Sequence, residues 1–472
     1  MRQCVIDTLL TKHSQAVEAA LAREVDVPLP LSGVEDLHAE TERQRMMPSV
    51  DVICGDVLDV LQAMPAASVH CVCTSPPYYG LRSYNIPPRR WDDGSECVLG
   101  DEPTLELYVQ HLVDVFREVK RVLHPSGSFF LNLGNAYASG GRHDERPEIY
   151  NIPKDAKPKR PRQKRRSGKD LLLVPEHAAI ALQRDGWIVR QSIIWAKALS
   201  FCPGYSGSVM PESTRDRCTW AYENLYHLVL QDQYYYDQDG CREPYADVTR
   251  AQLHSEYRGQ GRKAYAEAGA QNPSDVKRRV LAAVAGGAGR NLRNVWVIPK
   301  QNFTGAHFAT FPEKLVEPII KLATSEKGVC EACLEPLRRR VVREPVPVDV
   351  QARFEAMRAQ TAAETGRTDG HTQKRPNYRR KVLREEWEPG CQCGQGIIPA
   401  TVCDIFSGSC RAGIVAKRLG RSFIGIDANP DYCEMGRNAI AGVGNTPISE
   451  KQASTGRRTY TGFNARWKAA QD

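Results

Sequence analysis

The first half of the chain alternates short apolar runs with segments of helical periodicity. A helix is predicted from 57 until Pro65, and a longer one where apolar residues recur three or four apart from 105 to 123. His-Pro-Ser-Gly at 124–127 predicts the end of this second helix. The strands predicted around these helices are 50–56, 68–73 and 128–137.

The second half repeats this pattern between polar inserts. Helices are predicted at 175–184 and from Pro312 onward. The strands predicted here are 187–195, 224–231, 294–299, 401–405 and 423–427. Strands that alternate with helices predict an α/β fold with a doubly wound, mostly parallel sheet covered by helices.

Changes in polarity divide the chain into core segments and inserts. Three core segments lie at 49–240, 296–329 and 396–445. The other segments are an N-terminal extension 1–48, an insert 241–295, a Cys- and Arg-rich insert 330–395 and a polar tail 446–472. Inside the first core segment, nine of the sixteen residues 154–169 are Lys or Arg. That run has no periodicity, which predicts a solvated, self-repelling loop.

Composition limits the compartment and the partners. The net charge is +8 and is unevenly placed, so the basic segments are candidate contacts for an anionic partner. The 15 cysteines are scattered, and several lie in apolar runs, as is typical of thiols in a reducing compartment. No window reaches about 18 consecutive apolar residues, and the first residues lack an apolar secretion signal. We therefore expect a cytoplasmic protein without a membrane partner.

A Gly- and Ser-rich turn near the C-terminus predicts a nucleotide-type site. In "TVCDIFSGSCRAGIVAKRLGRSFIGID", a strand leads into small residues, a helix follows, and a second strand ends on Asp427. Small residues let the backbone approach a ligand, and an acid at the end of the second strand can bind ribose hydroxyls. The absence of G-x-G-x-x-G favours an adenosine ligand over a dinucleotide.

A second motif, "TSPPY", closes an apolar strand at 74–78. Two prolines fix the backbone rigidly at this point. By itself the motif is typical of a turn at a strand end.

Together these segments resemble the amino-methylating DNA methyltransferases. "DIFSGSCRAG" and "GIDANPDY" are similar to the family's S-adenosylmethionine site, D-x-F-x-G-S-G, and "TSPPY" is similar to its catalytic D/N/S-P-P-Y/F motif. The catalytic motif comes first, as in the beta class, which also has elements like "GDVLDVLQAMP" and "HFATFPEKLVEPIIKLAT". The resemblance implies a circularly permuted, Rossmann-like class I methyltransferase core with a seven-stranded type of sheet and inserted DNA-recognition regions.

The resemblance also implies the site residues. The catalytic residues would be Ser75, Pro76, Pro77 and Tyr78. The cofactor-binding residues would be Asp56, Phe311, Pro312, Asp404, Phe406, Ser407, Gly408, Ser409, Cys410 and Asp427. Cys410 departs from the family pattern, which has Gly there, and its Cβ would crowd the cofactor if the position needed a positive φ.

The expected chemistry is methyl transfer to an exocyclic amino nitrogen of a flipped base. Such a nitrogen is a poor nucleophile, and acceptors on its two hydrogens favour a pyramidal nitrogen whose lone pair is available. Ser75 Oγ and the Pro76 carbonyl are suitable acceptors, and Tyr78 offers a stacking face. Within the family, Ser in this position favours cytosine N4. The alternatives are adenine N6, an RNA or protein-glutamine methyltransferase, and a catalytically weak DNA-binding relative.

Further groups suggest partners and a metal. Cys330, Cys333, Cys391 and Cys393 flank the Arg-rich insert, and four thiolates suit a structural zinc ion that holds 330–395 as a lobe. Unrelated thiols are the alternative. The resemblance implies double-stranded DNA as substrate, with the run 154–169 on phosphates and the inserts 241–295 and 334–388 as candidate base readers. It also suggests a bacterial or phage-infected host and a cognate restriction endonuclease as a candidate partner.

Overall fold

The computed structural model describes residues 47–81, 86–138, 169–202, 207, 209, 211–244, 289–300, 312–343, 352, 355–356 and 382–442. The chain divides into two units, 1–47 and 48–472, and all the described residues except Met47 belong to the second. The predictions made for the N-terminal extension, the tail, Phe311, nearly all of the basic run 154–169 and most of the two inserts lie outside the described residues.

Eight strands form the main sheet, in the order β1-β14-β13-β2-β5-β7-β6-β8. Their bounds are β1 Val50–Cys54, β2 Val69–Thr74, β5 Leu123–Leu133, β6 Ile188–Ala196, β7 Tyr222–Val229, β8 Val295–Val297, β13 Thr401–Asp404 and β14 Ser422–Asp427. Only β7 runs antiparallel to its neighbours β5 and β6. The predicted mostly parallel sheet is thus confirmed, with eight strands in place of seven because the edge strand β8 also pairs.

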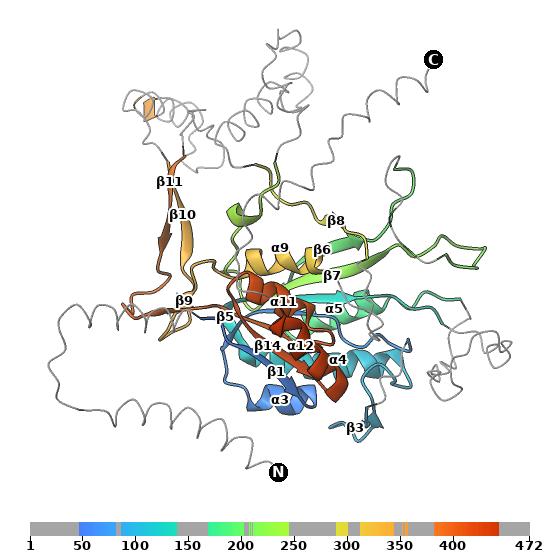
Figure 1. The fold of residues 1–472 in the computed structure, drawn as a ribbon. Helices are drawn as coiled ribbons and strands as arrows, with labels where there is room; N and C mark the ends of the chain where they lie inside the picture. Colours follow the sequence, from blue (N-terminus) through green and yellow to red (C-terminus); the bar gives the residue numbers. More distant parts are fainter. Residues whose placement is uncertain are drawn as a thin grey trace, which may run out of the picture. The chain divides into compact units, whose positions relative to one another are not determined.

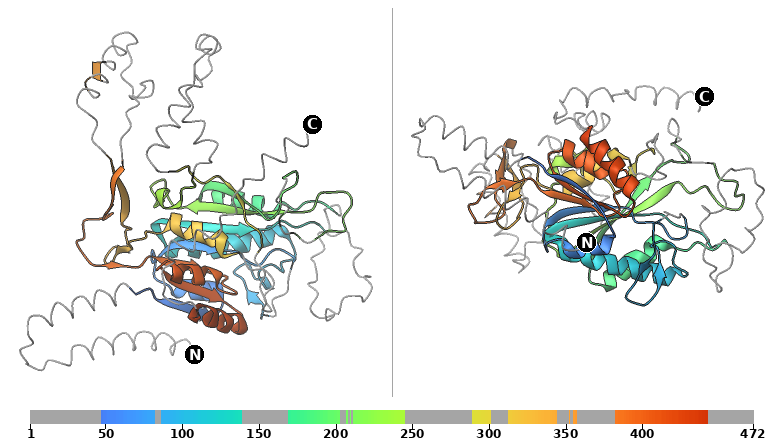
Figure 2. Two further views of the ribbon diagram at one scale, coloured as in Figure 1. Left: turned by 45° about the horizontal axis from the view of Figure 1, so that its top comes forward. Right: turned by 60° about the horizontal axis from the view of Figure 1, so that its bottom comes forward.

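Helices cover both faces of this sheet (Figures 1 and 2). One face carries α3 Val57–Ala63, α4 Leu105–Val122 and α5 Val174–Arg184. The other carries α9 Glu313–Ala323, α11 Arg411–Arg418 and α12 Pro430–Ala441. Side chains of one strand alternate between the two cores: Val72 packs with α3 and α4, whereas Cys71 and Cys73 pack with α9 and α11.

The pairing of β13 with β2 is the point at which the winding of the sheet reverses. From β13 the chain passes through α11 to β14 on one side, and from β2 it passes through α4 to β5 on the other. The two connections leave a crevice between them at the carboxyl ends of the strands. In open α/β sheets this is where ligands bind.

α4 ends directly before the segment 124–127, close to the predicted end, but the segment itself belongs to β5, which was predicted to begin only at 128. The helix ends at Val122, and β5 begins at once with Leu123. The register with β2 shifts between Val69↔Leu123 and Cys71↔Ser128, so the residues between form an irregularity within the strand. A Cβ at Gly127 would lie 2.9 Å from the His70 carbonyl, which explains the glycine there.

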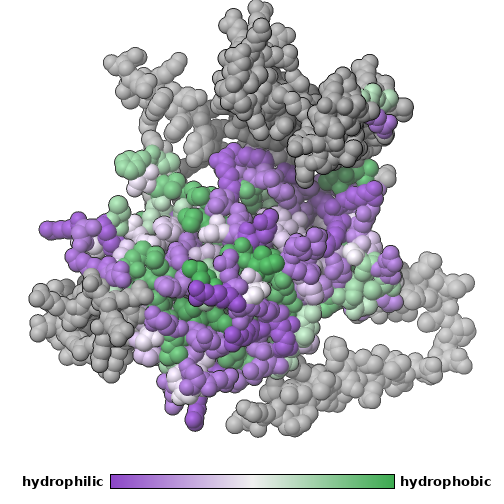
Figure 3. Space-filling view, turned by 180° about the vertical axis from the view of Figure 1, so that it is seen from behind, coloured by the Kyte–Doolittle hydropathy of each residue, from purple (hydrophilic) through white to green (hydrophobic). Residues whose placement is uncertain are grey.

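Short elements complete the described fold. They are β3 Arg89–Arg90, β4 Glu96–Cys97, the 3-10 turn η2 Asp239–Cys241, β9 Val329–Cys330, β10 Arg338–Arg343, β11 Val382–Glu388 and β12 Ile397–Ile398. β10 and β11 pair as an antiparallel hairpin. Among the described residues, no helix is long and apolar enough to cross a membrane. The face in Figure 3 is largely hydrophilic, with smaller apolar patches between.

Cys410 has a positive φ, the conformation in which its Cβ was expected to crowd the cofactor. Its φ is +52°, and it caps the start of α11. The side chain is fully buried against α12 and not in the crevice: a Cβ on Gly436 would overlap Cys410 Sγ and lie 3.1 Å from Cys410 Cβ. A glycine in α12 therefore makes room for the cysteine.

This packing predicts the effect of Gly436→Ala. The added methyl group would overlap buried atoms, so we expect the free energy of unfolding to fall by about 1–3 kcal/mol in chemical denaturation. Adding Cys410→Gly should recover part of this loss, because it removes the atoms that the methyl group meets. Gly442→Ala, at the C-terminal end of the same helix, is the control, since a Cβ there would lie 3.7 Å from its nearest atoms. Wild-type stability of Gly436→Ala would contradict the packing argument.

Candidate active site

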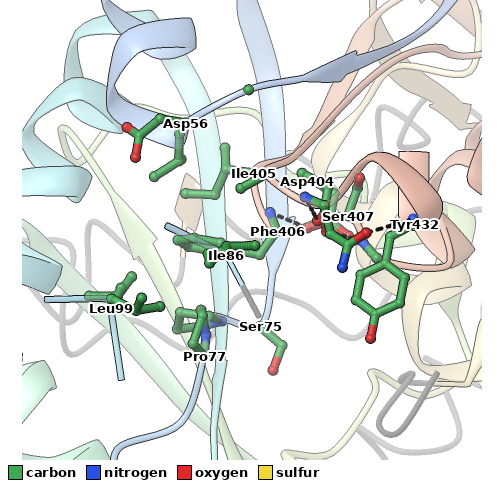
Figure 4. A pocket seen from close by; sticks show the side chains of 18 of the residues that line it. Asp56, Ser75, Pro77, Ile86, Leu99, Asp404, Ile405, Phe406, Ser407 and Tyr432 are labelled. Carbon is green, nitrogen blue, oxygen red and sulfur yellow. Dashed lines mark hydrogen bonds between the residues drawn. The ribbon is translucent and has the colours of Figure 1, made fainter. Parts of the chain in front are cut away.

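A pocket occupies the crevice between β13 and β2 (Figure 4). Its polar end is formed by the loops that follow β13 and β14, and its other end by the TSPPY motif after β2. Apolar side chains such as Val57, Ile405 and Leu99 line the space between. The predicted residues that line it are Asp56, Ser75, Pro76, Pro77, Tyr78, Asp404, Phe406, Ser407, Gly408, Ser409 and Asp427.

Three predicted cofactor residues are not in this lining. Cys410 lies behind the loop, in the core described above. Pro312 precedes α9 and is not a lining residue, although its neighbour Glu313 pairs with Arg411, which lines the pocket. Phe311 lies outside the described residues.

The loop after β13 is held by backbone bonds to the end of β14. Ser407 N donates to the Ile426 carbonyl at 2.8 Å, and Gly408 N donates to Asp427 Oδ2 at 2.8 Å. The other oxygen of Asp427 accepts from Asn429 N at 2.9 Å. Asp427 thus binds the loop after β13 with one carboxylate oxygen and its own loop after β14 with the other, a role that the ribose prediction did not include. Each oxygen keeps a second lone pair for a ligand.

Asp404 joins the cofactor loop to the catalytic strand. Its Oδ1 accepts from Thr74 Oγ1 at 2.6 Å and from Phe406 N at 3.2 Å. Burial raises the pKa of Asp404 to about 7, and the nearby Asp427 carboxylate adds to that rise. Burial also raises the pKa of Asp427, against the two backbone bonds that lower it. The poorly solvated site therefore disfavours the charged form of both acids, and with a pKa of about 7 Asp404 is partly protonated near neutral pH.

These residues fit the adenosine part of S-adenosylmethionine. Ser407 Oγ is a buried polar atom without a hydrogen-bond partner in the described residues, and Ser407 lines the pocket. Val57, Ile405 and Phe406 offer apolar surface for a base. Asp56 caps α3 by accepting from Leu58 N at 3.0 Å, and it also pairs with Arg89.

The catalytic motif is braced by α4. Tyr108 Oη donates to the Pro77 carbonyl at 2.8 Å, and Gly80 N donates to the Gly100 carbonyl at 2.7 Å. A Cβ on Gly100, whose φ is +99°, would lie 3.1 Å from Pro77 Cβ, so only glycine allows this approach. The prolines are therefore held from outside as well as by their own rings.

A hydrogen-bond chain runs from Ser75, the predicted catalytic serine, into the sheet. Ser75 Oγ donates to Tyr78 Oη at 3.1 Å, and Tyr78 Oη donates to Glu223 Oε2 at 2.9 Å. Lys197 pairs with the other Glu223 oxygen. Asn132 Nδ2 donates to Tyr78 Oη at 2.8 Å and to Glu223 Oε2 at 2.7 Å. Burial and the Glu223 charge raise the pKa of Tyr78, so its phenol keeps its proton and remains a donor.

Sequence reasoning found part of this set. The family resemblance also implies that the segments with Trp195 and Lys197 and with Tyr222 and Glu223 shape the target-base pocket, with ordinary core strands as the alternative for the apolar members. Lys197 directly follows β6, and Glu223 lies in β7. Asn132 was missed, because it is one polar residue inside the apolar run "SFFLNLG", which predicts only a strand. Trp91 and Leu99 of the pocket wall were also missed, because the segment 86–101 has no helical or strand periodicity.

The wall is supported by buried polar groups. Trp91 stacks on His111 with ring centroids 3.8 Å apart and planes 4° apart. His111 Nδ1 and Glu102 Oε1 lie 3.0 Å apart, and Glu102 Oε2 accepts from Gly100 N at 2.8 Å. Burial raises the pKa of Glu102, while the bonds to His111 and Gly100 lower it. Through Glu102, α4 holds the wall and the catalytic motif in one arrangement.

The four predicted zinc ligands also come together. The sulfur atoms of Cys330, Cys333, Cys391 and Cys393 all lie within 4.8 Å of one another. They lie away from the pocket, since none of the four lines it.

Comparison with known proteins agrees with this site. A sequence model for the N6/N4 family, described as DNA methylase, matches residues 69–330 and 399–438. Type II methyltransferase M.XycI of Xanthomonas campestris pv. cyanopsidis is 35% identical over 272 residues, which cover 57% of this chain and 71% of that protein. Type II methyltransferase M.Cfr9I of Citrobacter freundii is 34% identical over 300 residues, covering 63% and 79%. A solved structure of PvuII DNA methyltransferase (cytosine-N4-specific) has a TM-score of 0.41 and 16% identity, covering 87% and 93%.

The family model includes both the catalytic and the cofactor motif and matches more than half of the chain. This protein therefore belongs to the N6/N4 family of DNA methylases.

Proposed function

We propose that this methyltransferase transfers the methyl group of S-adenosylmethionine to N4 of a cytosine flipped out of duplex DNA. The observation that supports it is one pocket, with the TSPPY motif at one end and the Asp404 and Asp427 loops at the other. Ser75 favours cytosine over adenine through the family preference for Ser in N4 enzymes. Adenine N6 is the alternative that differs least in chemistry.

The residues around Ser75 suit an acceptor role toward the amino hydrogens. Ser75 directs its own proton to Tyr78 Oη, which leaves oxygen lone pairs for an amino hydrogen of the base. Tyr78 in turn donates to the Glu223 carboxylate, which fixes the direction of the chain. A second amino hydrogen is expected on the Pro76 carbonyl, in a motif that two prolines hold rigid.

The remaining roles follow from the same geometry. When bound, S-adenosylmethionine supplies an electrophilic methyl group on its sulfonium, and we expect Ser407, Gly408 and Asp427 to hold it. A Cβ on Gly134 would lie 2.5 Å from Tyr78 Cε2, so the ring packs on that glycine and has its other side for the base. No covalent adduct with the base is needed, so the mechanism needs no cysteine nucleophile.

We further propose a structural zinc ion in the four-cysteine cluster. A tetrahedral site with Zn–S bonds of about 2.3 Å places its sulfur atoms about 3.8 Å apart. The sulfur atoms here lie within 4.8 Å of one another, which is compatible with such a site after a small inward shift. The names of the Type II relatives likewise support a restriction–modification role, with a cognate restriction endonuclease as the proposed partner.

The base assignment is tested by methyl transfer from isotopically labelled S-adenosylmethionine to bacterial genomic DNA, followed by nucleoside mass spectrometry. We expect label in N4-methyldeoxycytidine, and none with Ser75→Ala. Label in N6-methyldeoxyadenosine would overturn the cytosine assignment. Parallel reactions offer bacterial RNA or protein in place of DNA, and label in RNA or in protein glutamine alone would replace the DNA substrate. Cofactor binding without transfer to any of these would show a catalytically weak relative.

The hydrogen-bond chain predicts the effect of Tyr78→Phe and Glu223→Gln. Tyr78→Phe removes the hydroxyl that binds both Ser75 and Glu223, and Glu223→Gln removes the charged acceptor of Tyr78. A hydrogen bond to a charged group stabilises an arrangement by about 1.5–3 kcal/mol. We expect kcat to fall roughly 10- to 100-fold while the Kd for S-adenosylmethionine changes little. Glu317→Gln, in the surface pair with Lys321, is the control and should leave kcat unchanged. Unchanged kcat in both test variants would exclude the chain from the reaction.

The proposed zinc ion predicts the metal content of the purified chain. Inductively coupled plasma mass spectrometry should find about one zinc ion per chain in wild type, and much less in Cys391→Ser/Cys393→Ser. A wild-type protein purified without zinc that keeps its fold after chelation would show that the cysteines are free thiols.

A further inference from the structure

The four cysteines lie on both sides of the β10–β11 hairpin. Cys330 and Cys333 precede β10, and Cys391 and Cys393 follow β11. Figure 1 shows the hairpin rising from the region of β9, apart from the helices that cover the sheet. An ion bound by both pairs would therefore join the two legs of the hairpin at its base.

The turn 330–334, which contains the first two cysteines, is bound to the start of β2. His70 Nδ1 accepts from Thr401 N at 3.0 Å, so this nitrogen carries no proton and the proton of the neutral ring is on Nε2. His70 Nε2 lies 2.9 Å from the Leu334 carbonyl and donates to it. His70 is only 2% exposed, so water does not compete for this bond.

A second histidine binds the same turn to the start of β5. His124 Nδ1 accepts from Ser126 N at 3.2 Å, which assigns the proton to Nε2 in the same way. His124 Nε2 lies 3.3 Å from the Cys333 carbonyl. The two imidazole rings stack, with centroids 5.5 Å apart. Two neighbouring strands therefore donate to consecutive carbonyls, those of Cys333 and Leu334.

The turn is also tied to the strand that carries the cofactor loop. Cys330 in β9 pairs with Ile397 in β12, and Glu331 N donates to the Gly396 carbonyl at 2.8 Å. β12 leads within three residues into β13, which ends at Asp404. His70, near the start of β2, thus contacts the cysteine turn directly, and β13 is linked to it through β12 and through the bond from Thr401 N to His70. The pocket lies at the other, carboxyl ends of β2 and β13.

We infer that the zinc ion acts as a clamp: it closes the base of the β10–β11 hairpin and, through Cys333 and Leu334, fixes that hairpin to the amino ends of β2 and β5. This inference rests on the proposed zinc ion. The clamp orients the β10–β11 hairpin, which lies in the Arg-rich insert, without contributing to the pocket. Zinc removal then loosens the base of the hairpin and leaves cofactor binding intact.

Arg339 provides a second, metal-independent anchor on β10. It pairs with Asp237 at 3.1 Å, with Glu326 at 3.0 Å and with Glu385 of β11. Its guanidinium also lies over the Trp387 ring, 4.5 Å from the centroid. Because this anchor does not involve the cysteines, zinc loss should loosen the base of the hairpin rather than unfold the chain.

The experiment is hydrogen–deuterium exchange on the full chain, read by peptide. We compare wild type, wild type stripped of zinc by a chelator, Cys391→Ser/Cys393→Ser and His124→Phe. The matched control is Cys202→Ser/Cys218→Ser, which changes two exposed cysteines outside the cluster. Zinc per chain and the Kd for S-adenosylmethionine are measured on each sample.

We expect zinc loss to raise exchange at least tenfold in peptides covering 329–343 and 382–398. Peptides covering 69–81 and 401–427 should stay within twofold, as should the Kd. His124→Phe should keep its zinc and raise exchange around 333–337. Zinc in the wild type with unchanged exchange after its removal would overturn the clamp alone, whereas absence of zinc would overturn the proposed ion. Exchange that rises across 401–427 as well would also overturn the clamp, because the ion would then support the whole core.

Discussion

One buried hydrogen bond joins the two motifs on which this protein depends. Thr74 Oγ1 donates to Asp404 Oδ1 at 2.6 Å, although the two residues are 330 positions apart in the chain. Thr74 ends the strand that leads to Ser75, and Asp404 ends the strand that leads to the cofactor loop. The parallel pairing of β2 with β13 puts them level, so both loops open into one crevice. A methyl donor and an amino acceptor can meet there only because these two strands are neighbours.

The neighbouring pairing of β13 with β14 brings two buried acids together. Asp404 and Asp427 end adjacent strands, so their carboxylates must be satisfied in a poorly solvated place. Backbone amides of Phe406, Gly408 and Asn429 satisfy them. The carboxylates thereby shape the loop before any ligand arrives. Preorganisation of this kind lowers the cost of ordering the site when the cofactor binds.

The sequence was sufficient for the fold class and for most of the lining of the pocket. Each strand and helix that positions the site has a strong local period, and the motifs have a fixed order. Asn132 could not be predicted, because its partners Tyr78 and Glu223 come from other strands and only the sheet order brings them together. The pocket wall at Trp91 could not be predicted, because Trp91 is held by stacking on the His111 ring rather than by the hydrogen bonds of a strand, which would leave a periodic pattern in the sequence. The position of the Cys410 side chain could not be predicted either. It depends on Gly436 in another helix, and no local sequence rule links the two residues.

The two ends of the sheet have different roles: the pocket lies at the carboxyl ends of the strands, and the contacts to the hairpin lie at the amino ends. At the carboxyl ends, loops with positive φ residues such as Gly408 and Cys410 leave the backbone open to a ligand. At the amino ends, buried histidines contact the base of a hairpin whose strands β10 and β11 are rich in Arg and Glu. A hairpin of that composition cannot be stabilised by a hydrophobic core, because a two-stranded unit is marginal in water. Its position must therefore come from ion pairs and carbonyl contacts at its base, and the proposed zinc ion would add bonds to thiolates there.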